Sequence, residues 1–376
     1  MLYTLGHSTL DTIAEAVEEA CRSFPEKPEL VLFFSDGERF SDLTEALHLR
    51  YPLSTVIGAS TYASFSPDGM CRRGLNATAL SDGIHVSAGL VREITRNPGM
   101  IYQDMVQDAL ARLPSSPERG SICCFVLNPA GTASEEAVLD MLDEALSGTG
   151  IPVFGGSASS EVCARGSVSL NGGAYSSSSV FVLMQLAEGC FRITQENIFR
   201  PMGRQFRVTK ANLARRTLYE LDGQPAADVL CGAMNVQKDA LAAALAQHPF
   251  GLALDGQLLI NEVERVNPDG SITAYCRFFE GSTVSLLEPR EFAETMDETL
   301  RRLHAAMPHP EFTVAVNCYS RTQMYLGNGW MNDFTDKMAA SLGNYMGLTS
   351  HGEQLGKYQL NLTLLLLSMG KRPLYE

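Results

Sequence analysis

The chain has 376 residues, of which 45% are hydrophobic, a length that exceeds one ordinary domain and suffices for two hydrophobic cores. Its formal net charge of −14 argues against a nucleic-acid partner, because neutralising phosphates needs a basic face and no Lys/Arg cluster offsets the acidic balance locally.

The ends of the chain and its cysteines predict a cytoplasmic protein. Residues 1–7 lack the charged region and apolar core of a signal peptide. The longest apolar tract, residues 360–369, is interrupted by polar residues and is too short to span a bilayer. The nine cysteines are odd in number and show no CxxC spacing, and no HExxH motif is present, so we expect free thiols and no metal site.

The first hundred residues predict one supersecondary unit. Its expected elements, in order, are a helix at residues 9–21, a strand at 30–34, a helix at 42–49, a strand at 55–60 and antiparallel strands from 83 to 91. The second strand contains Gly58 and ends in the hydroxyls of Ser60 and Thr61. Glycine there lets the backbone turn tightly or approach another group closely.

The same order of elements recurs in the next hundred residues. The expected elements are a helix at residues 101–113, strands at 122–127 and 152–156, a helix between them at 134–146, and antiparallel strands at 168–170 and 180–184. The glycine pair Gly155-Gly156 is followed by Ser157 and Ser159. We therefore predict an internal duplication, with units at residues 8–93 and 99–188 related by a pseudo-two-fold.

A third related unit is expected near the C-terminus. Its elements are a helix at residues 289–307, a strand at 312–318, a helix at 333–342, a strand at 344–350 and a final strand at 360–367. Before it, residues 198–211 break the strand pattern, and short strands with turns follow. We place the domain boundary there, with an N-terminal domain at residues 1–205 and a C-terminal domain at residues 206–376.

These elements predict an α/β fold of two mixed-sheet domains. Helices that connect strands give parallel neighbours, and hairpins give antiparallel ones. The N-terminal domain is the duplication, and the C-terminal domain combines the third unit with an antiparallel insertion. Ligands of such sheets bind at the carboxyl ends of the strands. A phosphate site is not expected, because no helix follows the glycines at once and no GxGxxG or GxxxxGK[ST] occurs.

Short motifs along nearly the whole chain carry a family resemblance. They are Gly58-Ala59-Ser60-Thr61, Gly155-Gly156-Ser157-Ala158, Pro201-Met202-Gly203, Val208-Thr209-Lys210, Leu221-Asp222-Gly223-Gln224-Pro225-Ala226, Glu280-Gly281, Cys318-Tyr319-Ser320-Arg321, Gly352-Glu353 and Asn361-Leu362-Thr363. In order and spacing they resemble the FIST proteins, a bacterial and archaeal sensory family with FIST N and FIST C domains. The resemblance implies sensing of small molecules such as amino acids, and a subset of the family is described as haem-binding. Since no output domain is visible, the chain contacts a signalling partner in trans or is a freed sensor.

Arg321 and Glu353 are the charged residues that we expect in the ligand site, because both follow apolar strands at the end where the site should lie. An Arg holds a carboxylate through two parallel hydrogen bonds, and a Glu pairs with an ammonium group. Together they suit a zwitterion. The alternative is that they pair with each other or cap a turn.

Polar side chains on neighbouring strands complete the expected site. Asn361 and Thr363 alternate on a presumed strand and share one face, where they line the pocket or satisfy backbone groups. Cys318 is placed at the same edge, although its apolar strand favours an inert buried thiol. The hydroxyls at the strand ends, which contact the ligand or make local turns, are Ser60, Thr61, Ser157 and Ser159.

Two other functions are weighed against sensing of a polar ligand. A serine hydrolase needs a glycine two residues after its nucleophile and then a helix, whereas Ser159 and strands follow Ser157. A haem protein needs an axial ligand, for which His85 and His351 are the candidates, but a lone histidine is more often structural. The sequence therefore predicts a non-enzymatic, cofactor-free cytoplasmic sensor of a small polar ligand, with haem-based gas sensing as the alternative.

Overall fold

The computed structural model describes residues 1–97, 99–115, 117–118, 120–160, 165–254 and 257–372. The chain forms two compact units that are not continuous in sequence. The larger unit contains Met1–Gln195, Met296–Gln359 and the residues from Leu364 onward, and the smaller unit contains Glu196–Thr295 and Leu360–Thr363. The predicted boundary between residues 205 and 206 falls inside one strand of the smaller unit.

The larger unit is built from three repeats. Repeat A comprises β1 (Leu2–Ser8), α1 (Ile13–Ala20), β2 (Leu30–Ser35), α2 (Phe40–Arg50), β3 (Thr55–Ser60), β4 (Ser64–Ser66), β5 (Gly69–Cys71) and β6 (Leu75–Ser81). Repeat B comprises β7 (Ile84–Arg92), α3 (Gly99–Ala111), β8 (Ile122–Pro129), α4 (Glu135–Ala145), β9 (Val153–Ala158), β10 (Val168–Leu170), β11 (Gly173–Tyr175) and β12 (Ser178–Leu186). Repeat C comprises β13 (Cys190–Asn197), α7 (Phe292–Ala306), β22 (Pro310–Cys318), α8 (Tyr319–Asn328), α9 (Met331–Leu342), β23 (Tyr345–Ser350), β24 (Glu353–Leu355), β25 (Tyr358–Leu360) and β26 (Thr363–Gly370).

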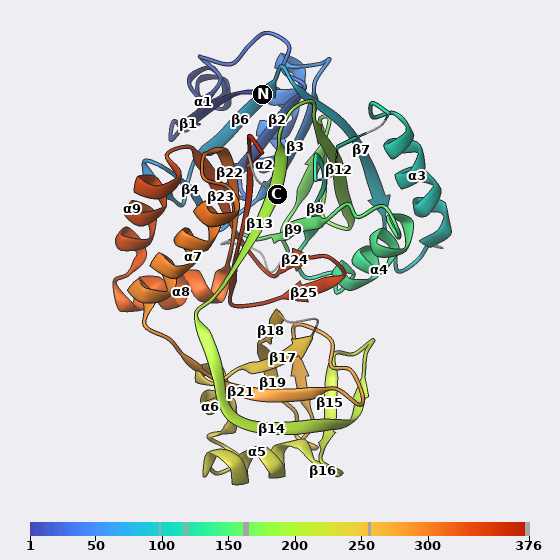
Figure 1. The fold of residues 1–376 in the computed structure, drawn as a ribbon, viewed down its shortest axis with the longest axis vertical. Coiled ribbons are helices and arrows are strands. Elements are labelled where there is room, and N and C mark those ends of the chain that lie inside the picture. Colours follow the sequence, from blue (N-terminus) through green and yellow to red (C-terminus); the bar gives the residue numbers. More distant parts are fainter. Residues whose placement is uncertain (98, 116, 119, 161–164, 255–256, 373–376) are drawn as a thin grey trace. The chain divides into compact units, whose positions relative to one another are not determined.

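Each repeat forms a mixed sheet with the same strand order, and the three sheets exchange hairpins (Figure 1). The shared orders are β1-β6-β2-β3, β7-β12-β8-β9 and β13-β26-β22-β23. Each sheet is completed by a hairpin from another repeat: β10–β11 pairs with β3, β24–β25 with β9, and β4–β5 with β23. The exchange therefore closes a three-membered cycle.

This topology confirms the predicted α/β class, the internal duplication and the third related unit. The expected pseudo-two-fold relationship between repeats A and B is wrong, because these two repeats do not exchange hairpins with each other. Repeat A takes its hairpin from repeat B, but repeat B takes its hairpin from repeat C, and repeat C takes its hairpin from repeat A. The hairpins also confirm that strands, not a helix, follow each glycine-containing strand.

The two parallel strands at the centre of each repeat meet in one common register. Gly58 pairs with Phe33, Gly155 with Val126, and Gly347 with Ala315. A Cβ on Gly155 would lie 2.0 Å from the Val126 carbonyl oxygen, and one on Gly58 would lie 2.4 Å from the Phe33 ring. These glycines are therefore needed for close approach between neighbouring strands, and not for a turn.

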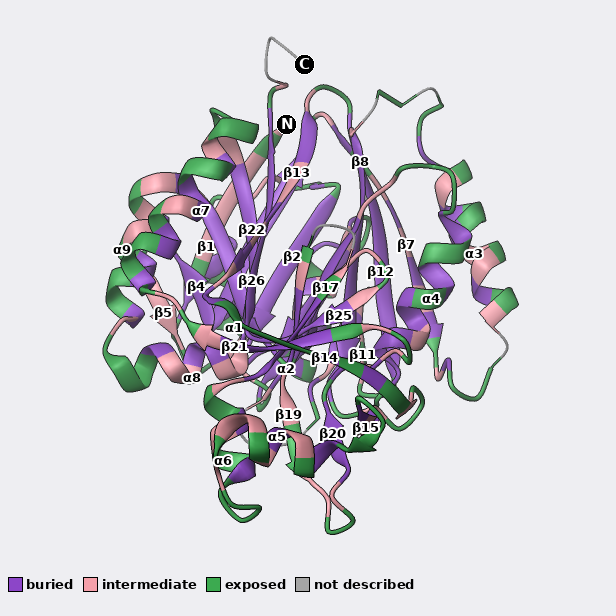
Figure 2. Cartoon of the chain, turned by 60° about the horizontal axis from the view of Figure 1, so that its bottom comes forward, coloured by how far each residue is buried: buried purple, intermediate pink, exposed green. Residues whose placement is uncertain are grey.

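Helices cover one face of each repeat's sheet. In repeat B, the buried strand residues Cys124, Val126 and Val153 share a core cluster with Val138 and Leu142 of α4. In repeat A, a second cluster joins β2, β3 and β6 to α1 and α2. Figure 2 shows the strands mostly in the colour of buried residues, whereas the helices are exposed along their outer faces. Alternate residues along each strand therefore point toward the helices or toward the other sheets.

The smaller unit is an antiparallel insertion between β13 and α7. Its elements are β14 (Phe199–Asn212), β15 (Thr217–Leu221), β16 (Gln224–Pro225), α5 (Ala226–Met234), α6 (Leu241–Gln247), β17 (Phe250–Leu254), β18 (Gln257–Asn261), β19 (Val263–Val266), β20 (Ile272–Ala274) and β21 (Thr283–Pro289). Residues 198–211 were expected to break the strand pattern, but β14 runs through them. A register shift between Pro201 and Gln205 accommodates the proline and glycine there.

The described part of the chain offers neither a candidate membrane helix nor a candidate metal cluster. None of its helices has the length and apolar character needed to cross a bilayer. No group of three or more His, Cys, Asp or Glu side chains there is arranged to hold a metal ion.

Candidate functional site

The central strands of the three repeats end in equivalent polar positions. The register pairs Ser35 with Ser60, Asn128 with Ser157, and Asn317 with Thr349. Each pair lies two residues beyond the glycine pair described above, so its side chains point to the helix-covered face. All of these residues are buried. The carboxyl edges of the three sheets therefore differ chiefly in what these polar side chains contact.

Three of the four predicted strand-end hydroxyls bind backbone groups where the repeats meet. Ser159 Oγ donates to the Thr349 carbonyl oxygen at 2.6 Å and accepts from the Tyr62 amide at 2.8 Å. Thr61 Oγ1 lies 2.9 Å from the same carbonyl oxygen, and Ser60 Oγ donates to the Ser159 carbonyl oxygen at 2.9 Å. These bonds link all three repeats, which supports the structural alternative for Ser60, Thr61 and Ser159.

Ser157 instead contacts Gln354, which sequence reasoning missed. Gln354 Nε2, which has two protons to donate, lies 2.9 Å from Ser157 Oγ, 3.0 Å from the Gly352 carbonyl oxygen and 3.1 Å from Gln359 Oε1. Ser157 and Gln354 are fully buried. The hydroxyl of Ser157 thus contacts an amide and not a histidine, so this contact supplies no general base for a nucleophile.

Arg321 and Glu353 lie in one fully buried region of repeat C and its exchanged hairpin. Arg321 comes from the first turn of α8, and its guanidinium lies 4.8 Å from the centre of the Tyr325 ring. Burial lowers the pKa of Arg321, while Tyr325 and the charge of Glu353 act in the opposite direction. Glu353 accepts a hydrogen bond of 2.5 Å from Ser350 Oγ. The structure therefore brings together the two charged residues that the sequence singled out.

Cys318 and its neighbour Asn317 end β22 immediately before α8. Cys318 is buried at the N-cap position of this helix. Asn317 Nδ2 donates to Thr322 Oγ1 at 2.8 Å, and that hydroxyl donates to the Cys318 carbonyl oxygen at 2.9 Å. The Asn317 Oδ1 atom, in contrast, has no hydrogen-bond partner among the described residues. This end of the strand thus retains one unused buried acceptor.

Aromatic side chains join repeats A and C beside this region. The Tyr319 and His351 rings stack with centroids 4.6 Å apart, and Tyr62 meets Tyr319 edge to face at 5.1 Å. His351 keeps access to solvent, yet desolvation of its ring lowers its pKa below the ordinary value. His85, the other candidate haem ligand, occupies an exposed position on β7.

Asn361 and Thr363 belong to the smaller unit and are not on one continuous strand. Asn361 and Leu362 lie between β25 and β26, and Leu362 has a φ of 52°, which interrupts the alternation. Asn361 Oδ1 accepts from the Cys276 thiol at 3.0 Å and from the Glu262 amide at 3.3 Å. Thr363 Oγ1 donates to the Asn361 carbonyl oxygen at 2.8 Å. These contacts support the backbone-satisfying alternative for both residues.

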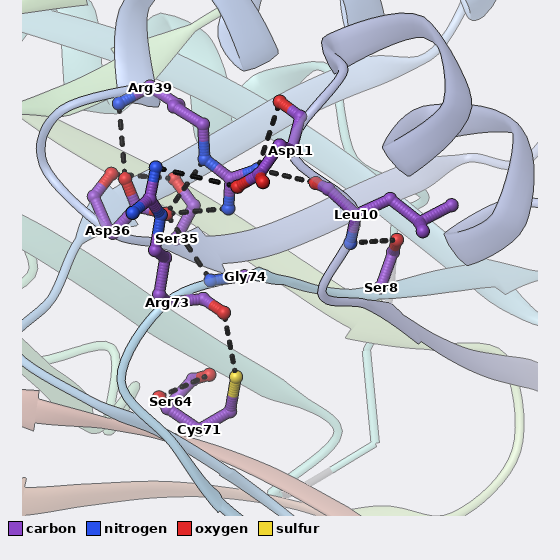
Figure 3. A network of polar contacts seen from close by, with 10 residues as sticks. All are labelled: Ser8, Leu10, Asp11, Ser35, Asp36, Arg39, Ser64, Cys71, Arg73 and Gly74. Atoms are coloured by element: carbon purple, nitrogen blue, oxygen red, sulfur yellow. Dashed lines mark hydrogen bonds and ion pairs between the residues drawn. The ribbon is translucent and has the colours of Figure 1, made fainter.

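Repeat A carries a buried ion pair at the equivalent edge, shown in Figure 3. Arg39 Nη2 lies 2.8 Å from Asp36 Oδ2, and Arg39 Nη1 donates to the Leu10 carbonyl oxygen at 2.6 Å. The same carboxylate oxygen accepts from the Gly74 amide at 3.3 Å. Both charged groups are therefore engaged within repeat A, which indicates a structural role.

Two buried amides that were not predicted from the sequence stand out in the sheet of repeat B. Asn128 is fully buried, and neither Nδ2 nor Oδ1 has a hydrogen-bond partner among the described residues. Gln354 Oε1 likewise has none. An alignment of the strand ends would have found Asn128, because it follows an apolar run just as Asn317 does. Gln354 could not be found in this way, because its hairpin reaches repeat B only through the exchange.

The larger unit also has an apolar cavity of about 690 Å³ away from these residues. It is lined in part by Leu110, Leu113, Ile122 and Ile151, and Ile122 is the first residue of β8. It therefore lies at the amino end of that strand and contains none of the predicted site residues.

Comparison with known proteins assigns the chain to a family. The FIST N domain matches residues 29–224 and the FIST C domain matches residues 226–355. No curated protein matches the chain. Among solved structures, a chorismatase is similar at 9% identity over 98% of each chain, with a TM-score of 0.34, a value too low to carry an argument. Because the two domain matches together span most of the sequence, the chain belongs to the FIST family, whose domains are sensory domains of signal transduction.

Proposed function

We propose that this protein is a non-enzymatic input protein that binds a small polar ligand, such as an amino acid or a related metabolite, in the cytoplasm. The observation that carries the proposal is the burial of Arg321 and Glu353 together at the carboxyl edge of repeat C. Fully buried charged side chains are rare, and groups whose pKa is shifted by burial cluster at functional sites.

The two charges fit the two ends of a zwitterion. The guanidinium of Arg321 would bind a carboxylate through paired hydrogen bonds, and the carboxylate of Glu353 would bind an ammonium group. Asn317 Oδ1, buried and unused among the described residues, offers a further acceptor at the same strand end. The ligand would signal by changing contacts with a partner protein in trans.

Ligand binding is tested by calorimetry with a panel of amino acids and their derivatives. We expect Arg321→Ala to weaken the binding of a carboxylate-bearing ligand by about 2 kcal/mol or more, because a buried charged hydrogen-bond partner is then missing. Arg39→Ala is the matched control, since Arg39 is also a buried strand-end arginine but is engaged by Asp36. It should lower stability and leave the affinity unchanged.

Two results would contradict this proposal. One is an affinity in folded Arg321→Ala equal to that of the wild type, which would remove Arg321 from the site. The other is turnover of the bound compound, which would favour an enzyme.

We further propose that the protein carries no haem. The strand ends present hydroxyls, amides and the Arg321–Glu353 pair, which suit a small polar ligand better than an apolar macrocycle. The absorption spectrum of the purified protein should therefore lack a Soret band. A Soret band that shifts on reduction and disappears in His351→Ala or His85→Ala would establish the gas-sensing alternative.

A further inference from the structure

Asn128, Ser157 and Gln354 gather on one face at the carboxyl edge of repeat B. The register pairs Val126 with Gly155 and Gly155 with Gln354, so these three residues share a face. Asn128 and Ser157, two residues beyond Val126 and Gly155, are paired neighbours on that same face. The face is the one covered by α4, whose Val138 and Leu142 pack with Val126. All three polar side chains are fully buried.

The orientation of the Gln354 amide is fixed by its contacts. Nε2 donates to the Gly352 carbonyl oxygen, which can only accept, so exchanging the amide oxygen and nitrogen would place two acceptors together. Gln354 Oε1 therefore remains an acceptor with no partner among the described residues, as do both polar atoms of Asn128. Ser157 Oγ accepts from Gln354 and keeps its own proton for a further bond.

The surplus is largest at repeat B, because the equivalent positions of the other two repeats each leave one buried polar atom without a partner among the described residues, Asn317 Oδ1 in repeat C and Ser169 Oγ in repeat A. At the equivalent position of repeat C, Asn317 donates to Thr322, and the residue equivalent to Gln354 is Phe65. In repeat A the equivalent strand-end residues are the serines Ser35 and Ser60, and Ser60 binds backbone groups. Leaving three buried polar atoms unused costs stability, typically 1–3 kcal/mol for each group. Such a cost indicates a group that is normally bound there.

We propose that Asn128, Ser157 and Gln354 form a buried site for a primary carboxamide. Asn128 Nδ2 and Oδ1 present a donor and an acceptor side by side, which is the complement of a carboxamide group in a head-to-tail pair. The second N–H of the ligand amide bonds to Gln354 Oε1, and the Ser157 hydroxyl donates to the ligand oxygen. A carboxylate is disfavoured, because it has no proton to give to the two amide oxygens.

This site is separate from the Arg321–Glu353 pair and does not rest on it. Glu353 and Gln354 are consecutive on β24 and therefore point to opposite faces of the sheet. Glu353 bonds to Ser350 of repeat C, whereas Gln354 bonds to Ser157 of repeat B.

The test uses matched amides and acids on the full chain: acetamide with acetate, propionamide with propionate, and nicotinamide with nicotinate. None of these carries an ammonium group, so none satisfies the Arg321–Glu353 pair as a zwitterion would. We expect at least one amide to raise the melting temperature, and its acid to give no rise at the same concentration. The response should persist in Arg321→Ala, which separates this proposal from the function proposed above.

The decisive variant is Asn128→Leu, of nearly equal size. We expect it to raise the melting temperature of the ligand-free protein by about 2 °C or more, because an uncompensated buried amide is removed, and to weaken amide binding at least about tenfold. Asn317→Leu is the matched control in repeat C; it should lower the melting temperature, since it breaks the bond to Thr322. If Asn128→Leu does not fold, Asn128→Ala must still abolish the amide response.

Three outcomes would overturn the proposal. The first is an equal response to each amide and its acid. The second is a melting temperature of Asn128→Leu that falls as far as that of Asn317→Leu, which would make Asn128 a structural residue. The third is a crystal grown with acetamide that holds an ordered water alone at Asn128.

Discussion

At the scale of single residues, burial decides what a polar group does here. The hydroxyls of Ser60, Thr61 and Ser159 resemble ligand-binding groups in the sequence, yet they hold backbone groups of other repeats in place. The sequence reveals that these residues end strands, but it does not reveal which backbone atoms arrive there from 190 residues away. Arg321 and Glu353 were selected because a charge beside an apolar strand is unusual, and this signal is local.

Burial also makes the protein sensitive to alkali through Cys21. Desolvation raises the pKa of this thiol from 9.0 to about 11, against opposing contributions from Tyr51 and Arg50. Between pH 9 and pH 11 the Cys21 thiol is deprotonated in the unfolded chain but still protonated in the folded protein. The free energy of unfolding therefore falls as pH rises from about 9 to about 11, and this group does not change it below pH 9. The loss should approach about 3 kcal/mol.

Urea unfolding at pH 8.5 and pH 11 measures this effect. In Cys21→Ala the difference in unfolding free energy between the two pH values should shrink by about that amount, although the variant is less stable at both because a buried side chain is truncated. An undiminished difference in the variant would show that other groups cause the alkaline loss.

At the scale of elements, the strands and helices of the repeats follow from the sequence, because each has a clear apolar period and a sharp end. The helix α8 was missed, since Tyr319–Asn328 is polar and aromatic and directly follows an apolar strand. The long strand β14 was missed as well, because Pro201 and Gly203 suggest a break that a register shift accommodates. In both cases tertiary packing overrides the local pattern.

The central glycines are an element-scale requirement that can be tested directly. We expect Gly155→Ala to destabilise the protein by about 1–3 kcal/mol, because its Cβ would lie 2.0 Å from the Val126 carbonyl oxygen and would force β8 and β9 apart. Gly327→Ala, in α8, is the control: a Cβ there meets nothing within 4 Å, and alanine favours a helix. Chemical denaturation compares the two, and equal stabilities would mean that the strands adjust without cost.

At the scale of the whole molecule, the sequence predicts three related units but not how they are joined. Hairpin exchange cannot be detected in the local pattern of apolar and polar residues, because a hairpin has the same pattern whichever sheet it completes. The residues that the exchange brings together, above all Gln354 beside Ser157, therefore could not be predicted. The charged pair at repeat C was predicted only because both of its members closely follow apolar strands of the same repeat, β22 and β23.

Hairpin exchange also bears on how the protein is made. Phe65, in the β4–β5 hairpin of repeat A, pairs with Gly347 of repeat C. This hairpin therefore cannot pair with its sheet until nearly the whole chain has been synthesised. The sheet of repeat B also remains incomplete until then, because β9 pairs with β24. The larger unit thus cannot be assembled repeat by repeat during synthesis. Until it is complete, its unpaired strand edges can form non-native pairs with other strands or other chains. A gene fragment cut after the FIST N match at residue 224 would encode the complete sheet of repeat A, a repeat B sheet that lacks the β24–β25 hairpin, and a β4–β5 hairpin without the sheet that it completes.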